Sequence, residues 1–166
     1  DTKIGIIKHF MDKADYFLIG GALANTFLKA KGFNIGKSLY EKDKIDLAKE
    51  IISEAKDKLI LPTDVITATE ISDEATTTEA SVEDIKDNDM ILDIGKASST
   101  KFCEIISKSK TVIWNGPLGL CEHKPFQEST RVVAKHLSES NCISILGGGD
   151  TTDALKRVGV SSEKFT

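Results

Sequence analysis

Cysteine and proline are scarce in this sequence, and neither residue type is arranged to hold a fold together. The three cysteines, Cys103, Cys121 and Cys142, are odd in number, far apart and without CxxC spacing. A disulfide framework and a zinc knuckle are therefore unsupported, and the cysteines fit a reducing, cytoplasmic setting. Three prolines and 12 glycines in an otherwise ordinary composition exclude collagen-like and proline-rich chains.

Excess positive charge and long apolar runs are also missing. Lys and Arg number 22 and Asp and Glu number 26, which gives a net charge of −4 with both signs interleaved along the chain. A nucleic-acid partner would favour a basic surface, so none is expected. The apolar runs are far shorter than the roughly 20 residues that cross a bilayer, and no signal peptide precedes Asp1, so no membrane partner is expected either.

What the sequence does contain is a regular alternation of helical and strand-like segments within 166 residues, a length that suits one domain. The periodicity predicts helices near 4–11, 22–31, 42–58, 98–108, 124–138 and from 150 onward, and strands at 16–19, 59–61, 65–66, 90–92, 111–114 and 143–146. The polar stretch 69–89 is expected to be a surface loop. Because the strands are apolar throughout, they should be buried on both faces. We therefore expect a doubly wound α/β fold: a mainly parallel six-stranded sheet with helices on both faces, a Rossmann-like three-layer sandwich.

Glycines follow the strands that end at Ile19, Leu92, Trp114 and Leu146. In such sheets ligands bind at the carboxyl ends of the strands, so these turns are the first place to look for a site. A superficially similar segment, residues 32–38, resembles a phosphate-binding P-loop. It is one residue too short and follows a helix rather than a strand, which favours an ordinary helix end and turn.

The strongest of these turns is Gly147-Gly148-Gly149-Asp150, between a strand and a helix. Three glycines let a ligand approach the backbone, and the amides at a helix start attract anions such as phosphate. Asp150 suits two roles equally well: a helix N-cap, or a ligand of Mg²⁺, which prefers one or two carboxylates together with phosphate oxygens.

The turn from Trp114 to Glu122 is the second candidate. Its amide, glycines and proline could line an apolar slot for a planar base, with Glu122 accepting from a ribose hydroxyl, or the segment could be an ordinary strand-to-helix turn. Lys3 lies near the start of the first predicted helix, where the helix dipole makes a positive charge unfavourable. Either a solvated lysine side chain or a bound phosphate would explain its presence there.

Taken in order, these segments resemble the C-terminal, nucleotide-binding domain of the phosphoglycerate kinase family over nearly the whole chain. The resemblance is carried by eight segments: Asp1–Ile4, Ile19–Ala24, Thr26–Lys29, Ile35–Leu39, Leu61–Asp64, Leu92–Gly95, Trp114–Pro117 and Gly147–Asp150. It implies that residues 1–166 are a single nucleotide-binding domain, and that the N-terminal domain that holds 3-phosphoglycerate lies outside this sequence.

The resemblance also implies roles for individual residues. Lys3 matches a catalytic lysine that contacts the nucleotide phosphates, and Asp150 matches the magnesium ligand. The nucleotide-binding positions are Gly20, Gly21, Leu39, Gly95, Pro117 and Leu120 around the adenine, Glu122 at the ribose, and Asn115, Gly148, Gly149, Thr151 and Thr152 near the phosphates.

The family reaction transfers a phosphoryl group reversibly from 1,3-bisphosphoglycerate to MgADP, giving 3-phosphoglycerate and MgATP in glycolysis. The resemblance thus implies a monomeric kinase domain that binds ADP or ATP with Mg²⁺ and does not turn over alone. Departures from the family pattern are Lys96 in place of proline, Cys121 in place of phenylalanine, and a shortened join at Lys58–Leu59. Two alternatives stay open: a stand-alone nucleotide-binding module without catalysis and, on fold class alone, a nicotinamide-dependent dehydrogenase.

Overall fold

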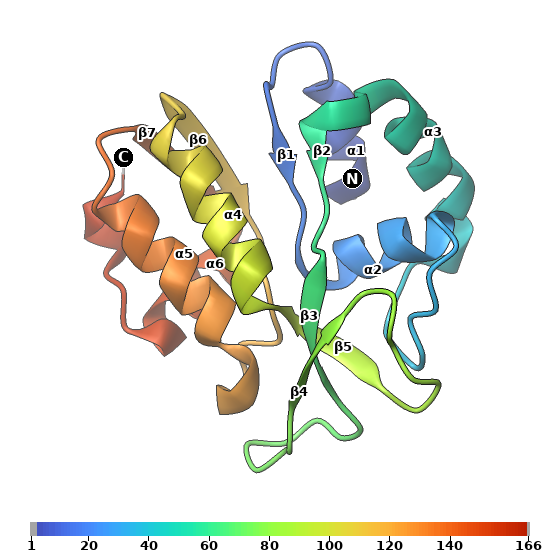
Figure 1. Ribbon diagram of the computed structural model, residues 1–166. Helices are drawn as coiled ribbons and strands as arrows, with labels where there is room; N and C mark the ends of the chain where they lie inside the picture. Colours follow the sequence, from blue (N-terminus) through green and yellow to red (C-terminus); the bar gives the residue numbers. More distant parts are fainter. Residues whose placement is uncertain (1–2, 166) are drawn as a thin grey trace.

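The computed structural model describes residues 3–165 and shows two α/β halves that flank a small antiparallel sheet (Figure 1). Its seven strands form three separate sheets, with the orders β1-β2, β4-β3-β5 and β6-β7. Four short 3-10 helices complete the described elements: η1 (Lys42–Lys44), η2 (Lys56–Lys58), η3 (Lys124–Phe126) and η4 (Ser162–Lys164).

The first half contains α1 (Lys3–His9), β1 (Phe17–Leu18), α2 (Gly21–Ala30), α3 (Ile45–Ala55) and β2 (Leu59–Ile60). β1 and β2 are parallel, with Phe17 opposite Leu59 and Leu18 opposite Ile60. Since side chains alternate along a strand, Phe17 and Leu59 pack against the core cluster built from α1, α2 and α3, whereas Leu18 and Ile60 pack against the cluster of the second half. The pair is thus flanked by apolar side chains on both faces.

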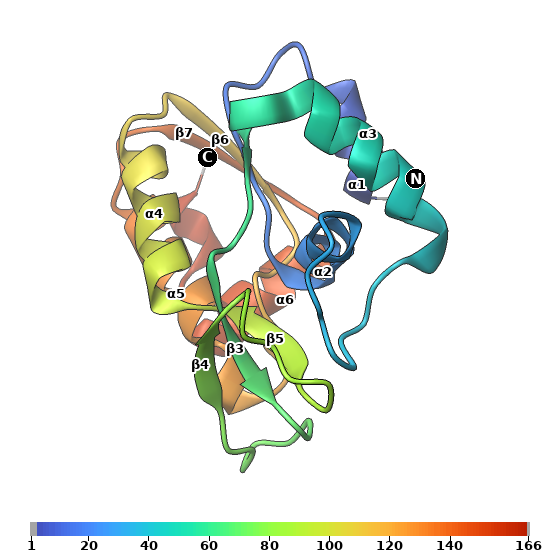
Figure 2. The same cartoon turned by 45° about the vertical axis from the view of Figure 1, so that its right-hand side comes forward.

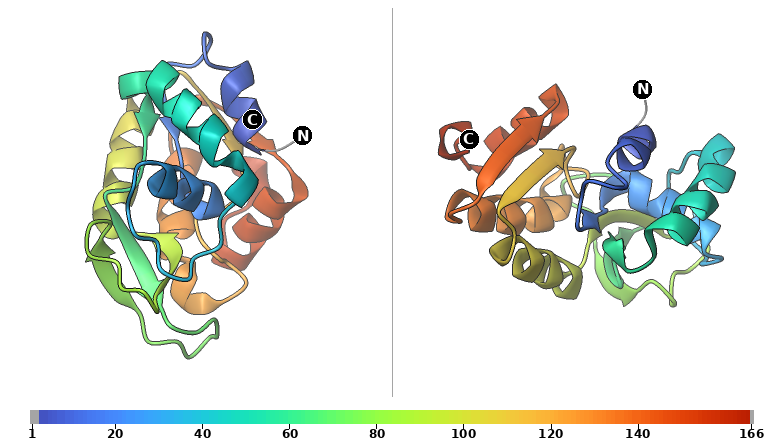
Figure 3. Two further views of the ribbon diagram at one scale, coloured as in Figure 1. Left: turned by 90° about the vertical axis from the view of Figure 1, so that its right-hand side faces the viewer. Right: turned by 90° about the horizontal axis from the view of Figure 1, so that it is seen from above.

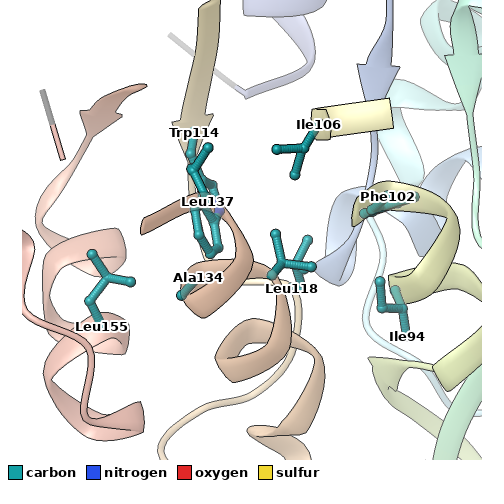
Figure 4. Packing of buried hydrophobic residues seen from close by; sticks show 9 residues of the cluster. Ile94, Phe102, Ile106, Trp114, Leu118, Ala134, Leu137 and Leu155 are labelled. Atoms are coloured by element: carbon teal, nitrogen blue, oxygen red, sulfur yellow. The ribbon is translucent and has the colours of Figure 1, made fainter. Parts of the chain in front are cut away.

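The second half contains α4 (Lys96–Ser107), β6 (Thr111–Asn115), α5 (Glu128–Ser138), β7 (Ile143–Gly147) and α6 (Gly149–Val158). β6 and β7 are parallel over five residue pairs, from Thr111 opposite Ile143 to Asn115 opposite Gly147. Figure 4 shows the core of this half, in which Trp114 of β6 lies among side chains from α4, α5 and α6. The opposite face of the pair is open, because Ile113, Ile143 and Ile145 are 53%, 52% and 46% exposed.

The third sheet lies at the lower end of the molecule in Figure 2 and joins β3 (Asp64–Ala68), β4 (Thr78–Ser81) and β5 (Met90–Ile94). Both pairings to β3 are antiparallel. Val65 and Ile91 of this sheet pack with Leu28 and Ile35, which ties it to the first half, while Ile94 belongs to the core of the second.

The predicted α/β class is confirmed, with parallel strand pairs and helices packed on them. The single six-stranded sheet is not found among residues 3–165, because the strand pairs β1-β2 and β6-β7 do not hydrogen-bond to each other and β3 pairs antiparallel with β5. The stretch 69–89, predicted as a loop, contains β4, whose polar residues are held by pairing with β3 rather than by burial. The helix predicted over 124–138 is divided into η3 and α5. No helix within residues 3–165 is long and apolar enough to cross a membrane.

Candidate functional site

A cavity of about 1870 Å³ lies between the two halves, and its lining includes the turns at the carboxyl ends of β1 and β6. Nine of the residues singled out from the sequence line it: Lys3, Gly20, Gly21, Leu39, Asn115, Pro117, Leu120, Glu122 and Asp150. They come from α1, the turn after β1, the segment after α2, the turn after β6 and the start of α6. Residues far apart in the chain therefore converge on one space.

The turn after β1 packs directly against the turn after β6. Gly21 donates its amide hydrogen to the carbonyl of Leu118 at 3.0 Å, and a methyl group on Gly20 would lie 2.6 Å from the Leu118 side chain. Gly21 itself has a φ of +67°, which favours glycine. The contact places the carboxyl ends of β1 and β6 at the same edge of the molecule, although no strand hydrogen bond joins them.

The turns after β6 and β7 also meet. A methyl group on Gly147 would lie 3.3 Å from the side-chain nitrogen of Asn115, so the amide of Asn115 lies beside the triple-glycine turn. The ammonium group of Lys3 occupies the space where a side chain on Gly116 would stand, and Gly116 has a φ of +91°. An exposed cation and an exposed amide group thus flank the start of α6.

α6 begins with Gly148 as its N-cap, at a φ of +84°, and Asp150 lies in the first turn. No side chain caps this helix, so of the two roles considered for Asp150 the structure excludes the N-cap. Asp150 is exposed and lines the cavity. Nothing lies within 4 Å of the position that a methyl group on Gly149 would take, which leaves room beside the free amides of the helix start.

The next residue, Thr151, is 1% exposed and faces inward. Its hydroxyl oxygen accepts from the amide of Gly116 at 2.6 Å and donates to the carbonyl of Gly147 at 2.7 Å. Thr152 is half-buried in the same turn. The hydroxyl of Thr151 therefore fixes the position of the two glycine turns relative to each other. Only the backbone of Thr151 is left to face a ligand.

Gly95 lies elsewhere. It is buried at the start of α4, and a side chain there would collide with the carboxylate of Asp64. That carboxylate accepts from the amides of Ala97 and Ser98 at 3.0 and 2.8 Å, so Asp64 caps α4. Gly95 is not among the residues that line the cavity.

Two further residues belong to the site, although nothing in the sequence identifies them as site residues. Asn25 is 2% exposed, lines the cavity and donates to the carbonyl of Leu39 at 3.0 Å, which positions a residue whose own side chain is 77% exposed. The side-chain oxygen of Asn25 has no hydrogen-bond partner among the described residues. In the sequence it is a polar residue in the middle of a helix, a position usually exposed to solvent.

The second is Asp93, which is 2% exposed at the end of β5. Its carboxylate accepts from the amides of Ile94 at 2.9 Å and Ser129 at 3.2 Å, and it fills the space that a side chain on Gly119 would need. Burial raises the pKa of Asp93 to about 7, against the opposing effect of these hydrogen bonds. Asp93 therefore holds the turn after β6 against the start of α5.

Within residues 3–165, no group of three or more His, Cys, Asp or Glu side chains could hold a metal ion. A lone carboxylate still fits Mg²⁺, because this ion usually takes one or two carboxylates and completes its shell with phosphate oxygens and water. The exposed Asp150, beside a helix start that favours phosphate, meets that requirement.

A comparison with protein families matches residues 1–166 to a family model described as phosphoglycerate kinase. The chain is 48% identical over 160 residues to a phosphoglycerate kinase of Lactobacillus acidophilus, covering 96% of this chain and 40% of that protein. It is 45% identical over 168 residues to the phosphoglycerate kinase of Dictyoglomus turgidum, covering 99% of this chain and 42% of that protein. The chain thus spans about two fifths of the length of the curated relatives it matches.

Solved structures agree. The structure resembles phosphoglycerate kinase from Coxiella burnetii with a TM-score of 0.94 and 37% identity, covering 98% of this chain and 42% of that one. It resembles phosphoglycerate kinase from Pyrococcus horikoshii with a TM-score of 0.82 and 26% identity, covering 97% of this chain and 43% of that one.

Proposed function

The chain belongs to the phosphoglycerate kinase family, and on that premise we propose that it is the nucleotide-binding part of such a kinase, taking ADP or ATP with Mg²⁺ at the carboxyl ends of β1, β6 and β7. The observation that carries the proposal is that the glycine turns after β1 and β6 line one cavity, with Lys3, Asn115 and Asp150 exposed beside them, and that the triple-glycine turn lies against Asn115. Glycines permit close approach, and the polar groups match a phosphate chain with its metal ion.

The base and ribose fit the side of the cavity near β1. Gly20 and Gly21 offer a surface without side chains, while Pro117, Leu120 and Leu39 supply apolar walls for a planar ring. Leu39 is 77% exposed, an unfavourable state for a leucine that a stacked base would relieve. Glu122 is exposed at the rim and would accept from a ribose hydroxyl.

The phosphates fit the side near α6. The backbone amides at Gly148, Gly149 and Thr151 belong to the open start of a ten-residue helix, which favours anions. Asp150 would hold the magnesium ion, and Lys3 would neutralise phosphate charge from the opposite side. When bound, the ion would offset charge on the phosphate oxygens during transfer.

No protein nucleophile is needed for this reaction, because phosphoryl transfer depends on positioning and on charge stabilisation. Thr151, Asp93 and Asn25 hold the turns that carry the binding groups, and Lys3 stabilises charge. We propose that the longer protein transfers a phosphoryl group between 1,3-bisphosphoglycerate and ADP. The residues that bind the phosphoglycerate would lie outside these 166, in an N-terminal domain, so the chain alone should bind nucleotide without turnover.

Calorimetric titration with MgADP tests the site. We expect binding by the unaltered chain and a loss of about tenfold or more in affinity for Asp150→Asn, measured with magnesium present. Asp153→Asn, the same change one turn further along α6, is the matched control and should bind like the parent. Equal losses in both variants, or no binding at millimolar nucleotide, would reject the assignment.

A further inference from the structure

The side-chain oxygen of Asn25 is a buried hydrogen-bond acceptor that the fold leaves unused. The amide nitrogen of the same side chain donates to the carbonyl of Leu39 at 3.0 Å, but the oxygen has no partner among residues 3–165. Asn25 is 2% exposed, and the oxygen is closed to solvent, so water does not take the place of a partner. A buried acceptor without a partner is destabilising, and native proteins keep few of them.

The bond to the Leu39 carbonyl does not by itself explain why this buried side chain is an asparagine. The segment after α2 runs back beside the helix, as the left view of Figure 3 shows, and two other side chains hold it there. The buried hydroxyl oxygen of Thr26 accepts from the amide of Glu41 at 3.0 Å. The buried hydroxyl oxygen of Ser38 accepts from the amide of Ile91 at 2.8 Å. The segment is therefore fixed on both sides of Leu39 without help from the unpaired oxygen.

Asn25 lies in an apolar part of the cavity wall. Leu28, which follows three residues later on the same face of α2, also lines the cavity, as do Val65 and Ile91, with which Leu28 packs. Leu39, which the asparagine holds, belongs to the proposed base side of the cavity. A single acceptor in apolar surroundings is typical of a group that orients a ligand, because a hydrogen bond is stronger where water is excluded.

The proposed position of the ribose decides which edge of a base would meet Asn25. Glu122, the proposed ribose contact, is exposed at the rim of the cavity, whereas Asn25 is buried. A base whose ribose stays at the rim enters with the opposite edge first. In adenine that edge carries one hydrogen-bond donor, the 6-amino group, beside an acceptor ring nitrogen. The unpaired oxygen of Asn25 matches this donor.

We propose that the side-chain oxygen of Asn25 accepts a hydrogen bond from the 6-amino group of adenine, which makes Asn25 a residue that determines base specificity. The inference rests on the proposed nucleotide site and adds the group that recognises the base. One side chain then has two functions: its nitrogen positions Leu39, and its oxygen selects the ligand. A base without a donor on this edge leaves the oxygen unpaired and therefore binds more weakly.

Calorimetric titration of the 166-residue chain with two ligands tests the proposal. The ligands are ADP and purine riboside 5′-diphosphate, which differs from ADP only in lacking the amino group, each with Mg²⁺. We expect ADP to bind about fivefold more tightly, the effect of one hydrogen bond. Equal affinities would overturn the proposal and leave the nucleotide site intact. No binding of either ligand at millimolar concentration would reject the nucleotide site and this inference with it.

Two variants of Asn25 separate recognition of the base from positioning of Leu39. Asn25→Ala removes both functions, so the two ligands should bind it with affinities within about twofold of each other. Asn25→Asp keeps an acceptor oxygen, so the preference for ADP should persist even where both ligands bind more weakly. A preference for ADP that survives in Asn25→Ala would show that Asn25 acts only on the structure and would contradict the proposal.

Asn34→Ala is the matched control. It also removes an asparagine that donates to a backbone carbonyl, that of Ile85 at 2.9 Å, and Asn34 does not line the cavity. This variant should keep the full preference for ADP, and loss of the preference here would contradict a specific role for Asn25. Urea unfolding of each variant shows whether it folds, and the comparison of the two ligands on the unaltered chain needs no variant at all.

Discussion

The hydroxyl oxygen of Thr151 accepts a hydrogen bond from the amide of Gly116 at 2.6 Å and so ties the first turn of α6 to the turn after β6. Thr151 is 1% exposed, so water cannot replace this bond if it is lost. The two turns belong to different strands and carry different parts of the proposed site. Their relative position therefore depends on one buried side chain.

Replacing Thr151 tests that dependence. Thr151→Val keeps the shape but leaves the Gly116 amide and the Gly147 carbonyl without a partner, and we expect a loss of about 1–3 kcal/mol in the free energy of unfolding in urea. MgADP affinity should fall as well. Thr151→Ser retains the hydroxyl and should behave nearly like the parent. A valine variant as stable as the serine variant would show that the bond does not hold the turns.

A substitution at Gly149 should affect binding without destabilising the fold, because a methyl group there meets nothing within 4 Å. Gly149→Ala should leave the free energy of unfolding unchanged or raise it by up to about 1 kcal/mol, through a lower entropy of the unfolded chain. If phosphate lies against this helix start, the same methyl group should reduce MgADP affinity about tenfold or more. Calorimetry with an unfolding curve separates the two effects, and unchanged affinity would remove phosphate from this position.

Asp93 predicts a pH dependence of stability. Its pKa is raised to about 7 by burial, above the value of about 3.9 for an unfolded aspartate, so the folded protein holds this proton more tightly. Its contribution to stability is therefore complete below about pH 4, falls as the pH rises toward 7, and is lost above that. Carboxylates whose pKa is lowered, such as Glu50 and Glu128, lose their stabilising effect at lower pH, so they act in a different window.

Comparison with Asp93→Asn isolates this effect. In urea unfolding between pH 5 and 8, the parent should lose stability with rising pH relative to the variant, because the asparagine does not titrate. Other titrating groups contribute equally to both proteins, so their contributions cancel in the difference between the two free energies of unfolding. A difference that does not change across this range would show that Asp93 does not titrate there.

Asn25 tests the base side of the cavity. Its side chain donates to the carbonyl of Leu39, so Asn25→Ala should loosen that segment and weaken ADP binding by about 2–10-fold, the range of one hydrogen bond. Binding of inorganic pyrophosphate should change little. Asn34→Ala removes a similar bond, to the carbonyl of Ile85 at 2.9 Å, away from the cavity and serves as the matched control. An equal effect on both ligands would place Leu39 outside the base site.

Much of the fold could be predicted from the sequence because the buried strands are apolar throughout. Met90–Ile94 shows the limit of that signal: its apolar run resembles the parallel strands, yet it pairs antiparallel with β3. β4 has no apolar pattern at all and exists because β3 lies beside it. Strand direction and strand order depend on contacts between distant segments, which the periodicity of one segment does not contain.

In the candidate site, too, some residues could be predicted from the sequence and others could not. The glycine turns could be predicted because their residue types are unusual directly after a strand. The sequence does not show which way a side chain points, so it does not distinguish the buried side chain of Thr151 from the exposed side chain of its neighbour Asp150. Gly95 looked like the other glycines, although it makes room for the carboxylate of Asp64. Asn25 and Asp93 act through burial, which only the fold provides.

The position of the metal–nucleotide complex is tested most directly by NMR with Mn²⁺ in place of Mg²⁺ and ADP as the ligand. Paramagnetic broadening should be strongest at the amides of Gly148, Gly149 and Asp150, extend to Asn115, and fade toward Asp64 and Glu79, which do not line the cavity. Asp150→Asn should abolish it, and Asp153→Asn should leave it in place. Broadening centred away from the start of α6, or unchanged in the Asp150 variant, would contradict the proposed site.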